Sequence, residues 1–253
     1  MANFTELAPQ LIDLSQIDLN DSCQVRKGGT KIEDLILYDE FPEEIDLESN
    51  LGAAALKRLQ ILYERFETNL EYKFADKVIS RNADDTDYML YERFVRLIQA
   101  ESSLSAMASS KRVLFIGSGP FPISPILFSN LVGAEVDCYD KSEEACVTSR
   151  QVIDQLGLTG RVNILNVSGE NGLVNNYDAV IIALLAQPKD QILNNIWKNI
   201  TDDTKVICRT SEGIRRIFYR ETAPNTYPQY SVIGLHRAGM DDTISSLLLG
   251  RGK

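Results

Sequence analysis

The sequence predicts an α/β protein in which a smaller helical domain precedes a Rossmann-like, doubly wound sheet. After about residue 110, apolar strand-like runs alternate with helical stretches, which is typical of crossover connections in a parallel sheet. Before it, apolar residues recur at three- and four-residue steps, which is typical of helices. The charge shifts at the same place, because residues 1–110 hold 21 acidic and 11 basic residues and residues 111–253 hold 15 of each. We therefore expect two domains, 1–110 and 111–253.

The N-terminal part is expected to contain two amphipathic helices separated by the polar segment 81–87. The first apolar stripe consists of Leu59, Leu62, Phe66, Leu70, Phe74 and Val78. The second consists of Tyr88, Tyr91, Phe94, Val95 and Ile98. Each stripe covers one face of a helix, as burial against a core requires. Between residues 20 and 50, the KGG and FPEE segments predict turns, and IEDLILYD is compatible with either a helix or a strand.

The C-terminal part is expected to form the sheet. Its strand-like runs are 113–117, 134–140, 162–166, 178–185 and 204–210, and its helical stretches include 142–157 and 189–200. YSVIGLHR and DTISSLLLG lie close together near the C-terminus and predict a terminal antiparallel pair. In such an open sheet, a ligand binds beyond the carboxyl ends of the first strands.

The composition argues against several classes of protein and site. No apolar run approaches the roughly 18 residues that cross a bilayer, and MANFTELAPQ lacks the regions of a signal peptide, so we expect a cytoplasmic protein without a membrane partner. The net charge of −10 argues against binding nucleic acid, which requires a basic face, and favours cationic ligands. His236 is the single histidine and the four cysteines show no ligand-like spacing, so no metal site is expected.

The most informative segment is RVLFIGSGPFPIS, where a buried strand leads into glycines. Gly117, Ser118, Gly119 and Pro120 predict a tight turn that a ligand can approach closely. Asp140 ends the next strand 21 positions after Gly119, where a carboxylate accepts hydrogen bonds from ribose hydroxyls. The alternative is a plain turn with a helix-capping aspartate. Together with the alternating strands, the pattern favours a nucleoside ligand.

The prolines of this turn distinguish between nucleoside ligands. NAD, FAD and S-adenosylmethionine all fit a glycine turn at this place in the sheet. A dinucleotide's pyrophosphate requires backbone N–H donors and a third glycine. Pro120 and Pro122 lack N–H groups, and no third glycine follows. S-adenosylmethionine has no phosphate, and its sulfonium suits an acidic environment, so it is the favoured ligand.

Several separated motifs resemble the nicotianamine synthase family. They are FIGSGPFPIS, YD at the second strand's end, LLAQPKDQ after the fourth strand and RTSEGIRRIFY after the fifth, with a weaker likeness in NLEYKFADKVI. The family carries a Gly-x-Gly-Pro-x-Pro turn, an Ala-Leu segment and an Arg-Thr/Ser segment ending in a tyrosine. The resemblance implies a sheet of the S-adenosylmethionine-dependent transferase type. Its nearest relations are archaeal synthases and the shorter bacterial enzymes of opine-type metallophore pathways.

The resemblance also implies a reaction. The protein is expected to be an enzyme that uses S-adenosylmethionine as a co-substrate and needs no metal for catalysis. In this family, the acceptor's amine attacks the methylene carbon of the aminobutanoate arm, and methylthioadenosine is released. The product is a nicotianamine-like metal chelator, which implies a role in metallophore biosynthesis. The expected acceptor is an amino acid, either histidine or an aminobutanoate intermediate.

The resemblance assigns the general base to Glu71. From the residues alone, Glu71 shares a helix face with Glu64 and Glu67, and a solvated acidic stripe is the alternative. The family's tyrosine on the second N-terminal helix is replaced here by Phe94. Tyr91, one turn earlier, is the candidate substitute, with core packing as its alternative.

Further candidates follow the later strands. Arg209, at the carboxyl end of the fifth strand, is a candidate clamp for a substrate carboxylate, with a structural ion pair as the alternative. The residues that end the third strand are expected to flank the adenine, and they are Asn166, Val167 and Ser168. By the resemblance, Ala183 and Leu184 of the Ala-Leu segment also contribute to the cofactor site. Gln187 and Lys189 lie beyond the fourth strand, and Lys189 is expected at the surface, at a helix start.

Two other functions share these features. An S-adenosylmethionine-dependent methyltransferase would have the same sheet and cofactor, but would leave S-adenosylhomocysteine. A non-catalytic nucleoside-binding module would bind the cofactor without consuming it, and a nicotinamide oxidoreductase is disfavoured by the prolines. The sequence leaves open which amino acid is the acceptor, how many transfers occur and whether the chain forms a homodimer.

Overall fold

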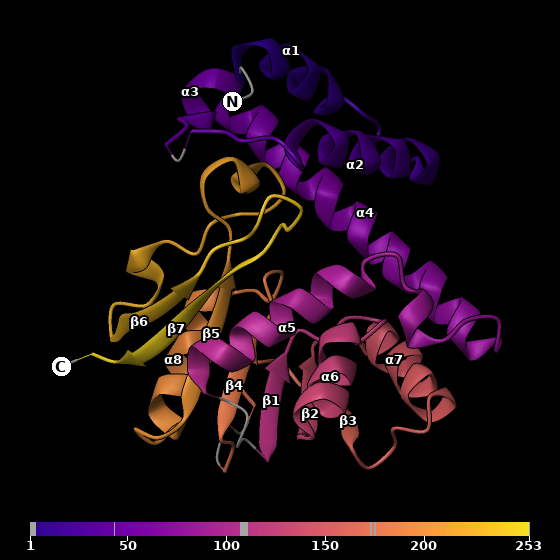
Figure 1. The fold of residues 1–253 in the computed structure, drawn as a ribbon, viewed down its shortest axis with the longest axis vertical. Coiled ribbons are helices and arrows are strands. Elements are labelled where there is room, and N and C mark those ends of the chain that lie inside the picture. The colour runs from indigo at the N-terminus through magenta and orange to yellow at the C-terminus, as the bar shows by residue number, and fades with distance from the viewer. Residues whose placement is uncertain (1–3, 43, 107–110, 173, 175, 253) are drawn as a thin grey trace. The chain divides into compact units, whose positions relative to one another are not determined.

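Helices and strands alternate through most of the second half of the chain (Figure 1). The structure is a computed structural model and describes residues 4–42, 44–106, 111–172, 174 and 176–252. The helices are α1 (Phe4–Leu14), α2 (Ser22–Ile36), α3 (Leu47–Leu51), α4 (Ala53–Ile79), α5 (Tyr91–Ser105), α6 (Ile123–Leu127), α7 (Glu143–Gln155) and α8 (Lys189–Asn199). The strands are β1 (Arg112–Ile116), β2 (Glu135–Asp140), β3 (Val162–Asn166), β4 (Ala179–Ile182), β5 (Lys205–Thr210), β6 (Tyr230–His236) and β7 (Ser245–Arg251). Short helical turns are η1 (Asp85–Asp87), η3 (Phe128–Val132), η4 (Gly213–Ile217) and η5 (Pro224–Thr226).

The chain forms two compact units. The smaller unit contains residues 1–70, 210–221 and 237–245, and the larger contains residues 71–209, 222–236 and 246–253. Helix α4 contributes residues to both units, because the division falls between Leu70 and Glu71. The division into domains at residue 110 stays a prediction.

The seven strands form one mixed sheet in the order β3-β2-β1-β4-β5-β7-β6. Strands β1 to β5 pair in parallel, with Ile116 of β1 opposite Tyr139 of β2 and Ile182 of β4. The last two strands pair antiparallel, with a register shift between Val232 and Gly234. The predicted fold class is therefore confirmed, including the terminal antiparallel pair.

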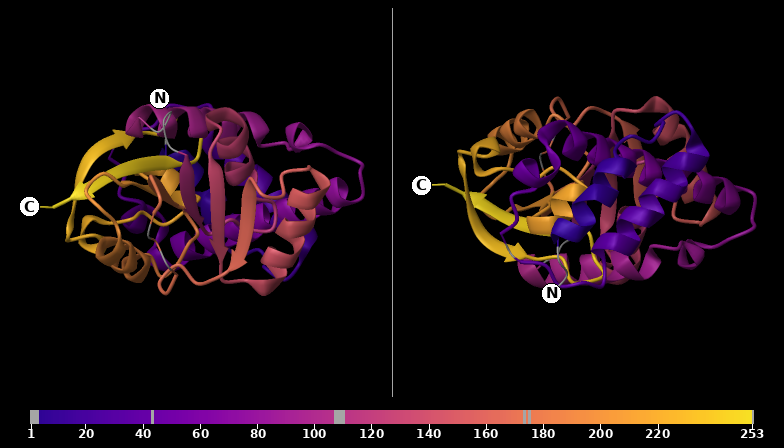
Figure 2. Two further views of the ribbon diagram at one scale, coloured as in Figure 1. Left: turned by 90° about the horizontal axis from the view of Figure 1, so that it is seen from below. Right: turned by 90° about the horizontal axis from the view of Figure 1, so that it is seen from above.

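Side chains of the central strands alternate between the two faces of the sheet. Leu114 and Ile116 of β1 belong to a buried cluster with residues of β4, β5 and α8. Phe115 points to the opposite face, where the Arg209 guanidinium lies 5.1 Å from its ring centroid and binds residues of α5 and α6. Figure 2 shows α5 and α6 on one side of the strands and α8 on the other. The strands are thus buried on both faces, which accounts for their continuous apolar runs.

In the smaller unit, helices α2 and α4 come unusually close. A Cβ atom added at Gly29 would lie 2.2 Å from Cγ of Phe66, and one added at Gly28 would lie 3.1 Å from Leu62. The prediction of a turn at KGG is therefore wrong, because both glycines lie inside α2. They are there so that the backbone of α2 can pack directly on the apolar face of α4. The segment IEDLILYD continues α2 as far as Ile36.

The two apolar stripes expected before residue 110 are found on α4 and α5. Phe66, Phe74 and Val78 are buried on α4, and Phe94 and Ile98 are buried on α5. The predicted second stripe includes Tyr88, which does not belong to α5. Tyr88 is the C-terminal cap of η1 and precedes the first residue of α5.

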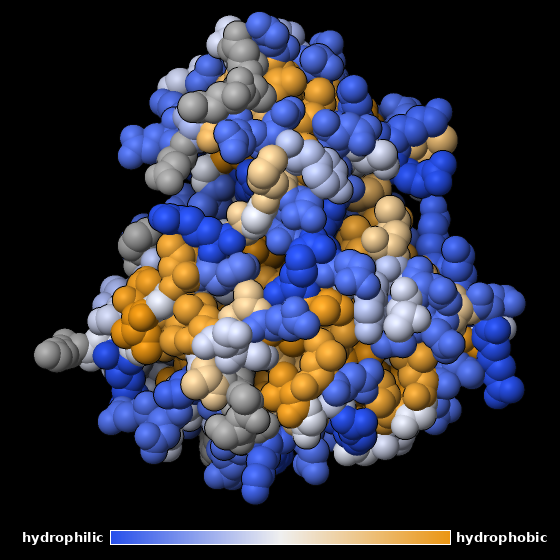
Figure 3. Space-filling view, viewed as in Figure 1, coloured by the Kyte–Doolittle hydropathy of each residue, from blue (hydrophilic) through white to orange (hydrophobic). Residues whose placement is uncertain are grey.

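The outer strand of the sheet carries exposed apolar side chains. In Figure 3, apolar residues gather over β6 and β7, and Val232 and Ile233 of β6 are 45% and 62% exposed.

No helix within the described ranges is long and apolar enough to span a membrane. Those same ranges contain no group of three or more His, Cys, Asp or Glu side chains arranged to hold a metal ion.

Candidate active site at the glycine turn

The turn after β1 is held tightly by its neighbours. Gly117 and Gly119 have φ angles of +87° and +69°, which glycine adopts without the strain that a Cβ atom causes. The N–H of Gly117 donates to the carbonyl of Tyr139 over 2.7 Å. A Cβ atom on Gly117 would lie 3.0 Å from the Cβ of Ala186 and 3.2 Å from that of Ala183. The turn therefore packs against both strands that flank β1.

Asp140 lies beside this turn at the end of β2. Its Oδ2 accepts a hydrogen bond from the N–H of Gly119 and its Oδ1 accepts one from the N–H of Ser142, both over 2.9 Å. Each carboxylate oxygen has a second lone pair, so both can still accept a hydrogen bond from a ligand hydroxyl. Asp140 thus orients the turn and keeps its capacity as an acceptor.

The turn offers few N–H donors to a ligand. Those of Gly117 and Gly119 already donate within the protein, and Pro120 and Pro122 have none. The hydroxyl of Ser118 is buried and has no hydrogen-bond partner among the described residues. A hydroxyl at this position can form a hydrogen bond with a ligand or a water molecule. A neutral or cationic ligand suits this turn better than a phosphate does.

Glu71 lies directly against the same turn. A Cβ atom added at Gly119 would lie 2.5 Å from Oε2 of Glu71. One turn further along α4, Phe74 packs edge-on against Phe121 of the turn, with ring centroids 4.8 Å apart. Tyr88 contacts both rings, at 5.0 and 4.9 Å. This buried aromatic cluster fixes α4 on the turn and brings the Glu71 carboxylate to Gly119.

Tyr72 is a neighbour of this site that the sequence did not single out. Burial raises the pKa of its hydroxyl, the nearby carboxylates of Glu144, Asp140 and Glu71 raise it further, and a hydrogen bond with Ser142 opposes them. The hydroxyl therefore stays protonated at neutral pH and can donate. The only sequence signal was its position next to Glu71, and an aromatic residue on a helix is more often part of a core.

The segment after β3 lies at the same edge of the sheet. Asn166 donates from Nδ2 to the carbonyl of Asp140 over 3.0 Å, which ties the ends of β3 and β2 together. Val167 packs beside Gly172, and a hydrogen bond with Ser168 lowers the pKa of Glu170. Asn166, Val167 and Ser168 are partly or fully exposed, so all three are accessible to a ligand.

The segment after β4 lies against the glycine turn through Ala183. Leu184 is buried, and its carbonyl accepts a hydrogen bond from Nζ of Lys189 over 3.0 Å. The expectation that Lys189 lies at the surface is wrong: its side chain is 4% exposed. The helix start sits over the carboxyl ends of β4 and β5, so the lysine extends inward. Gln187 is exposed, and its Oε1 accepts the backbone N–H of Lys189.

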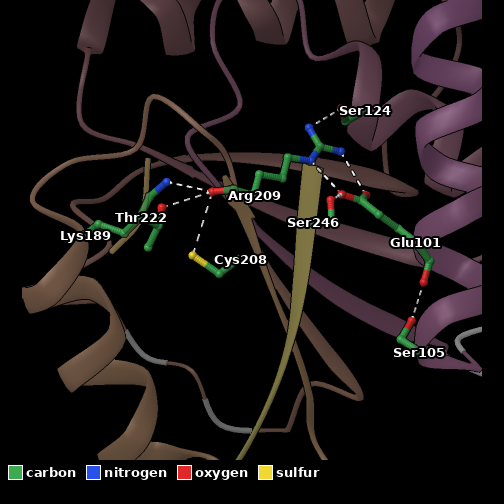
Figure 4. Close-up of polar contacts among 8 residues, drawn as sticks. All are labelled: Glu101, Ser105, Ser124, Lys189, Cys208, Arg209, Thr222 and Ser246. Carbon is green, nitrogen blue, oxygen red and sulfur yellow. Dashed lines mark hydrogen bonds and ion pairs between the residues drawn. The ribbon is translucent and has the colours of Figure 1, made fainter. Parts of the chain in front are cut away.

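Arg209 forms a buried ion pair with Glu101 of α5 (Figure 4). Its Nε and Nη2 donate to the two carboxylate oxygens over 2.9 and 3.0 Å, and its Nη1 donates to Ser124. Ser246 donates to the same carboxylate over 2.6 Å. Arg209 and Glu101 are 3% and 0% exposed. The bidentate carboxylate partner is thus Glu101, and the alternative of a structural ion pair describes this arginine better than a substrate clamp.

Tyr91 begins α5 near a different set of groups. Burial raises the pKa of its hydroxyl, and the carboxylates of Asp85 and Glu92 add to this effect. Phe94 is 9% exposed and stacks on Tyr88 at 6.5 Å, so it serves the aromatic cluster. A catalytic role for Tyr91 stays a prediction.

A family model and several characterised proteins are similar in sequence to this chain. Residues 40–253 match the family model described as nicotianamine synthase protein. An L-histidine 2-aminobutanoyltransferase of Yersinia pestis is 29% identical over 140 residues, which are 55% of this chain and 51% of the relative. Nicotianamine synthase 9 of Hordeum vulgare is 24% identical over 83% of this chain and 67% of the relative. The aligned part thus spans about half the length of the bacterial relative.

Solved structures show the same fold. Crystal structures of MtNAS in complex with MTA and tNA, and of a mutant in complex with S-adenosylmethionine, superpose with TM-scores of 0.88 and 0.87. Both are 23% identical in sequence and cover the whole of both chains.

The contact between Glu71 and Gly119 can be tested by adding a methyl group. Gly119→Ala and Gly133→Ala both place alanine at a positive φ, which costs about 1–2 kcal/mol in each. A Cβ at Gly133 meets nothing within 4 Å, whereas one at Gly119 meets Glu71. Urea unfolding should therefore show a larger loss for Gly119→Ala, and Glu71→Ala should restore part of the difference. Equal losses in all backgrounds would contradict the contact.

The buried ion pair predicts a large loss of stability from a small change. Glu101→Gln keeps the shape of the side chain but leaves the Arg209 charge uncompensated, which should lower the free energy of unfolding by about 3–5 kcal/mol. Ser103→Ala, on the exposed face of the same helix, is the control and should stay within about 0.5 kcal/mol of the wild type. Similar urea midpoints for the two variants would argue against a central role for the pair.

Proposed function

The chain belongs to the nicotianamine synthase family, and we propose that it transfers the aminobutanoate (3-amino-3-carboxypropyl) group of S-adenosylmethionine to the amine of an amino acid. The second product is methylthioadenosine. The observation that carries the proposal is the contact of the Glu71 carboxylate with Gly119, whose N–H donates to Asp140. The proposed general base and the proposed nucleoside-binding turn thus lie next to each other within one compact unit.

The turn suits S-adenosylmethionine in shape and charge. Gly117 and Gly119 let the ligand approach the backbone, and the unpartnered Ser118 hydroxyl supplies a hydrogen bond. Asp140 accepts hydrogen bonds from the ribose hydroxyls, the segment 166–168 flanks the adenine, and Ala183 and Leu184 contribute to the cofactor site. The turn has few free N–H groups, and S-adenosylmethionine has no phosphate that would require them. The carboxylates around Tyr72 favour the positive sulfonium.

The proposed reaction is a displacement at carbon. The acceptor's nitrogen forms a bond to the methylene carbon next to sulfur, the carbon–sulfur bond breaks, and its electron pair leaves with methylthioadenosine. Glu71 takes the proton that the ammonium nitrogen must lose, which makes the amine nucleophilic. Holding the amine in line with the breaking bond supplies the rest of the acceleration. The Tyr72 hydroxyl, which stays protonated, donates a hydrogen bond at this site.

The relatives support this reaction class. The Yersinia pestis relative is named for aminobutanoyl transfer to L-histidine, and the Hordeum vulgare relative for the synthesis of nicotianamine. The MtNAS complex with S-adenosylmethionine is that of a variant with glutamine in place of a glutamate. By analogy, the acceptor here is histidine or an aminobutanoate intermediate, and the product is a metal-chelating amino acid for metallophore biosynthesis.

Cofactor binding is tested by removing the ribose acceptor. Asp140→Ala should weaken S-adenosylmethionine binding by about 10- to 100-fold, since a hydrogen bond to a charged group contributes about 1.5–3 kcal/mol. Titration calorimetry on the purified protein measures the effect, and Asp202→Ala, at an exposed aspartate, is the control. Unchanged affinity would remove Asp140 from the site. Tighter binding of NAD by the wild type would overturn the choice of cofactor.

The reaction is tested with S-adenosylmethionine and candidate amino acids, beginning with histidine. The wild type should release methylthioadenosine and form an N-aminobutanoyl product. Glu71→Gln should be about 10²- to 10⁴-fold slower and should keep its cofactor affinity, because the base acts on the acceptor. Raising the pH should restore part of the rate, since more acceptor amine is then neutral. Glu64→Gln, at an exposed site on α4, should match the wild type.

Mass spectrometry of the mixture distinguishes the alternatives. S-adenosylhomocysteine with a methylated product would mean a methyltransferase. Binding without turnover of any amino acid would mean a non-catalytic module. Methylthioadenosine release at full rate by Glu71→Gln would keep the reaction class and remove Glu71 as its base.

A further inference from the structure

Lys189 is a buried cation that the proposed reaction does not use. Its side chain is 4% exposed, and no carboxylate pairs with it among the described residues. Its Nζ donates instead to two backbone carbonyls, those of Leu184 and Arg209, each over 3.0 Å. Burial lowers the pKa of this amine. Burying an unpaired ammonium costs several kcal/mol, so an apolar side chain would be the more stable choice unless the two bonds serve a purpose.

The two carbonyls belong to the ends of neighbouring strands. Leu184 follows β4, and Arg209 lies near the end of β5. Figure 4 shows the Arg209 carbonyl with donors from Lys189 and Thr222, so this end of β5 has a second anchor. The Leu184 carbonyl accepts a side-chain hydrogen bond from Lys189. The ammonium thus fixes the segment after β4 to the better-anchored end of β5.

The segment fixed in this way is the one that packs on the glycine turn. Ala183 and Ala186 are the nearest neighbours of a Cβ placed on Gly117. The N–H of Ala183 donates to the carbonyl of Ile116 over 2.9 Å, and that of Ala186 donates to Ala183 over 3.2 Å. A shift of the Leu184 carbonyl therefore moves the wall against which the turn is built.

We propose that Lys189 is a positioning residue for the nucleoside site: its ammonium holds residues 183–186 against the glycine turn and so sets the affinity for the nucleoside. This inference rests on the proposed function for the identity of the nucleoside, S-adenosylmethionine. The ammonium itself does not touch the reacting atoms. Losing it should therefore raise the KM for S-adenosylmethionine and leave kcat close to that of the wild type.

The test compares Lys189→Met with Thr222→Val. Methionine has a similar length and no donors, so Lys189→Met should bind S-adenosylmethionine about ten-fold or more weakly, as expected for lost charge-assisted hydrogen bonds. Thr222→Val removes a different donor to the Arg209 carbonyl and leaves Leu184 held, so it should keep wild-type affinity. Affinity is measured by calorimetry at a temperature at which all three proteins are folded. Equal affinity of Lys189→Met and the wild type would overturn the proposal.

Amide hydrogen exchange of the ligand-free proteins tests the positioning without the nucleoside. Residues 183–187 should exchange faster in Lys189→Met than in the wild type or Thr222→Val, and unchanged exchange would overturn the proposal. Failure of the wild type to bind S-adenosylmethionine would instead refute the proposed function, which keeps the two failures distinct. If Lys189→Met does not fold, Lys189→Gln keeps a shorter donor that reaches at most one carbonyl and should show the same two effects. Wild-type affinity and exchange in that variant would count against the proposal.

Discussion

The packing of the larger unit depends on the ion pair and hydrogen bonds that the buried Arg209 side chain forms in the core. Its guanidinium binds Glu101 of α5 and Ser124 of α6. Ser246 of β7 donates a further hydrogen bond to the Glu101 carboxylate. The Arg209 carbonyl accepts a hydrogen bond from Nζ of Lys189 in α8. Such a pair adds little net stability, because desolvation offsets the attraction between the charges. It does require one arrangement, since any shift of these elements would leave a buried charge unpaired.

This arrangement determines where the glycine turn lies. Ser124 is in α6, the helix that follows the turn, and Lys189 holds the segment after β4 that packs on Gly117. From the other side, the aromatic contact of Phe74 with Phe121 brings α4 onto the turn. Glu71 and the glycine turn are thus positioned by buried contacts of neighbouring residues.

The parts of this picture that depend on local pattern were predictable from the sequence. The alternation of strands and helices predicts the sheet, and its parallel topology brings Gly119 and Asp140 together, since Gly119 follows β1 and Asp140 ends the neighbouring strand β2. The pairing of Arg209 with Glu101 was not predictable, because the partners are 108 residues apart. Packing across elements likewise placed glycines inside α2 and buried Lys189, against their usual preferences. The role of Glu71 came from family resemblance, because its helix face shows only an acidic stripe.

The glycine turn disfavours a phosphate ligand because it has few free backbone N–H donors. In a dinucleotide site, free N–H groups at the helix start bind phosphate. Here two prolines lack N–H groups, and the N–H of Gly119 donates to Asp140. The carboxylate that can accept hydrogen bonds from a ribose therefore also uses an N–H donor that a phosphate would need. Glu71 places a second carboxylate against the same glycine. In the proposed function, the same two carboxylates repel anions and attract the sulfonium.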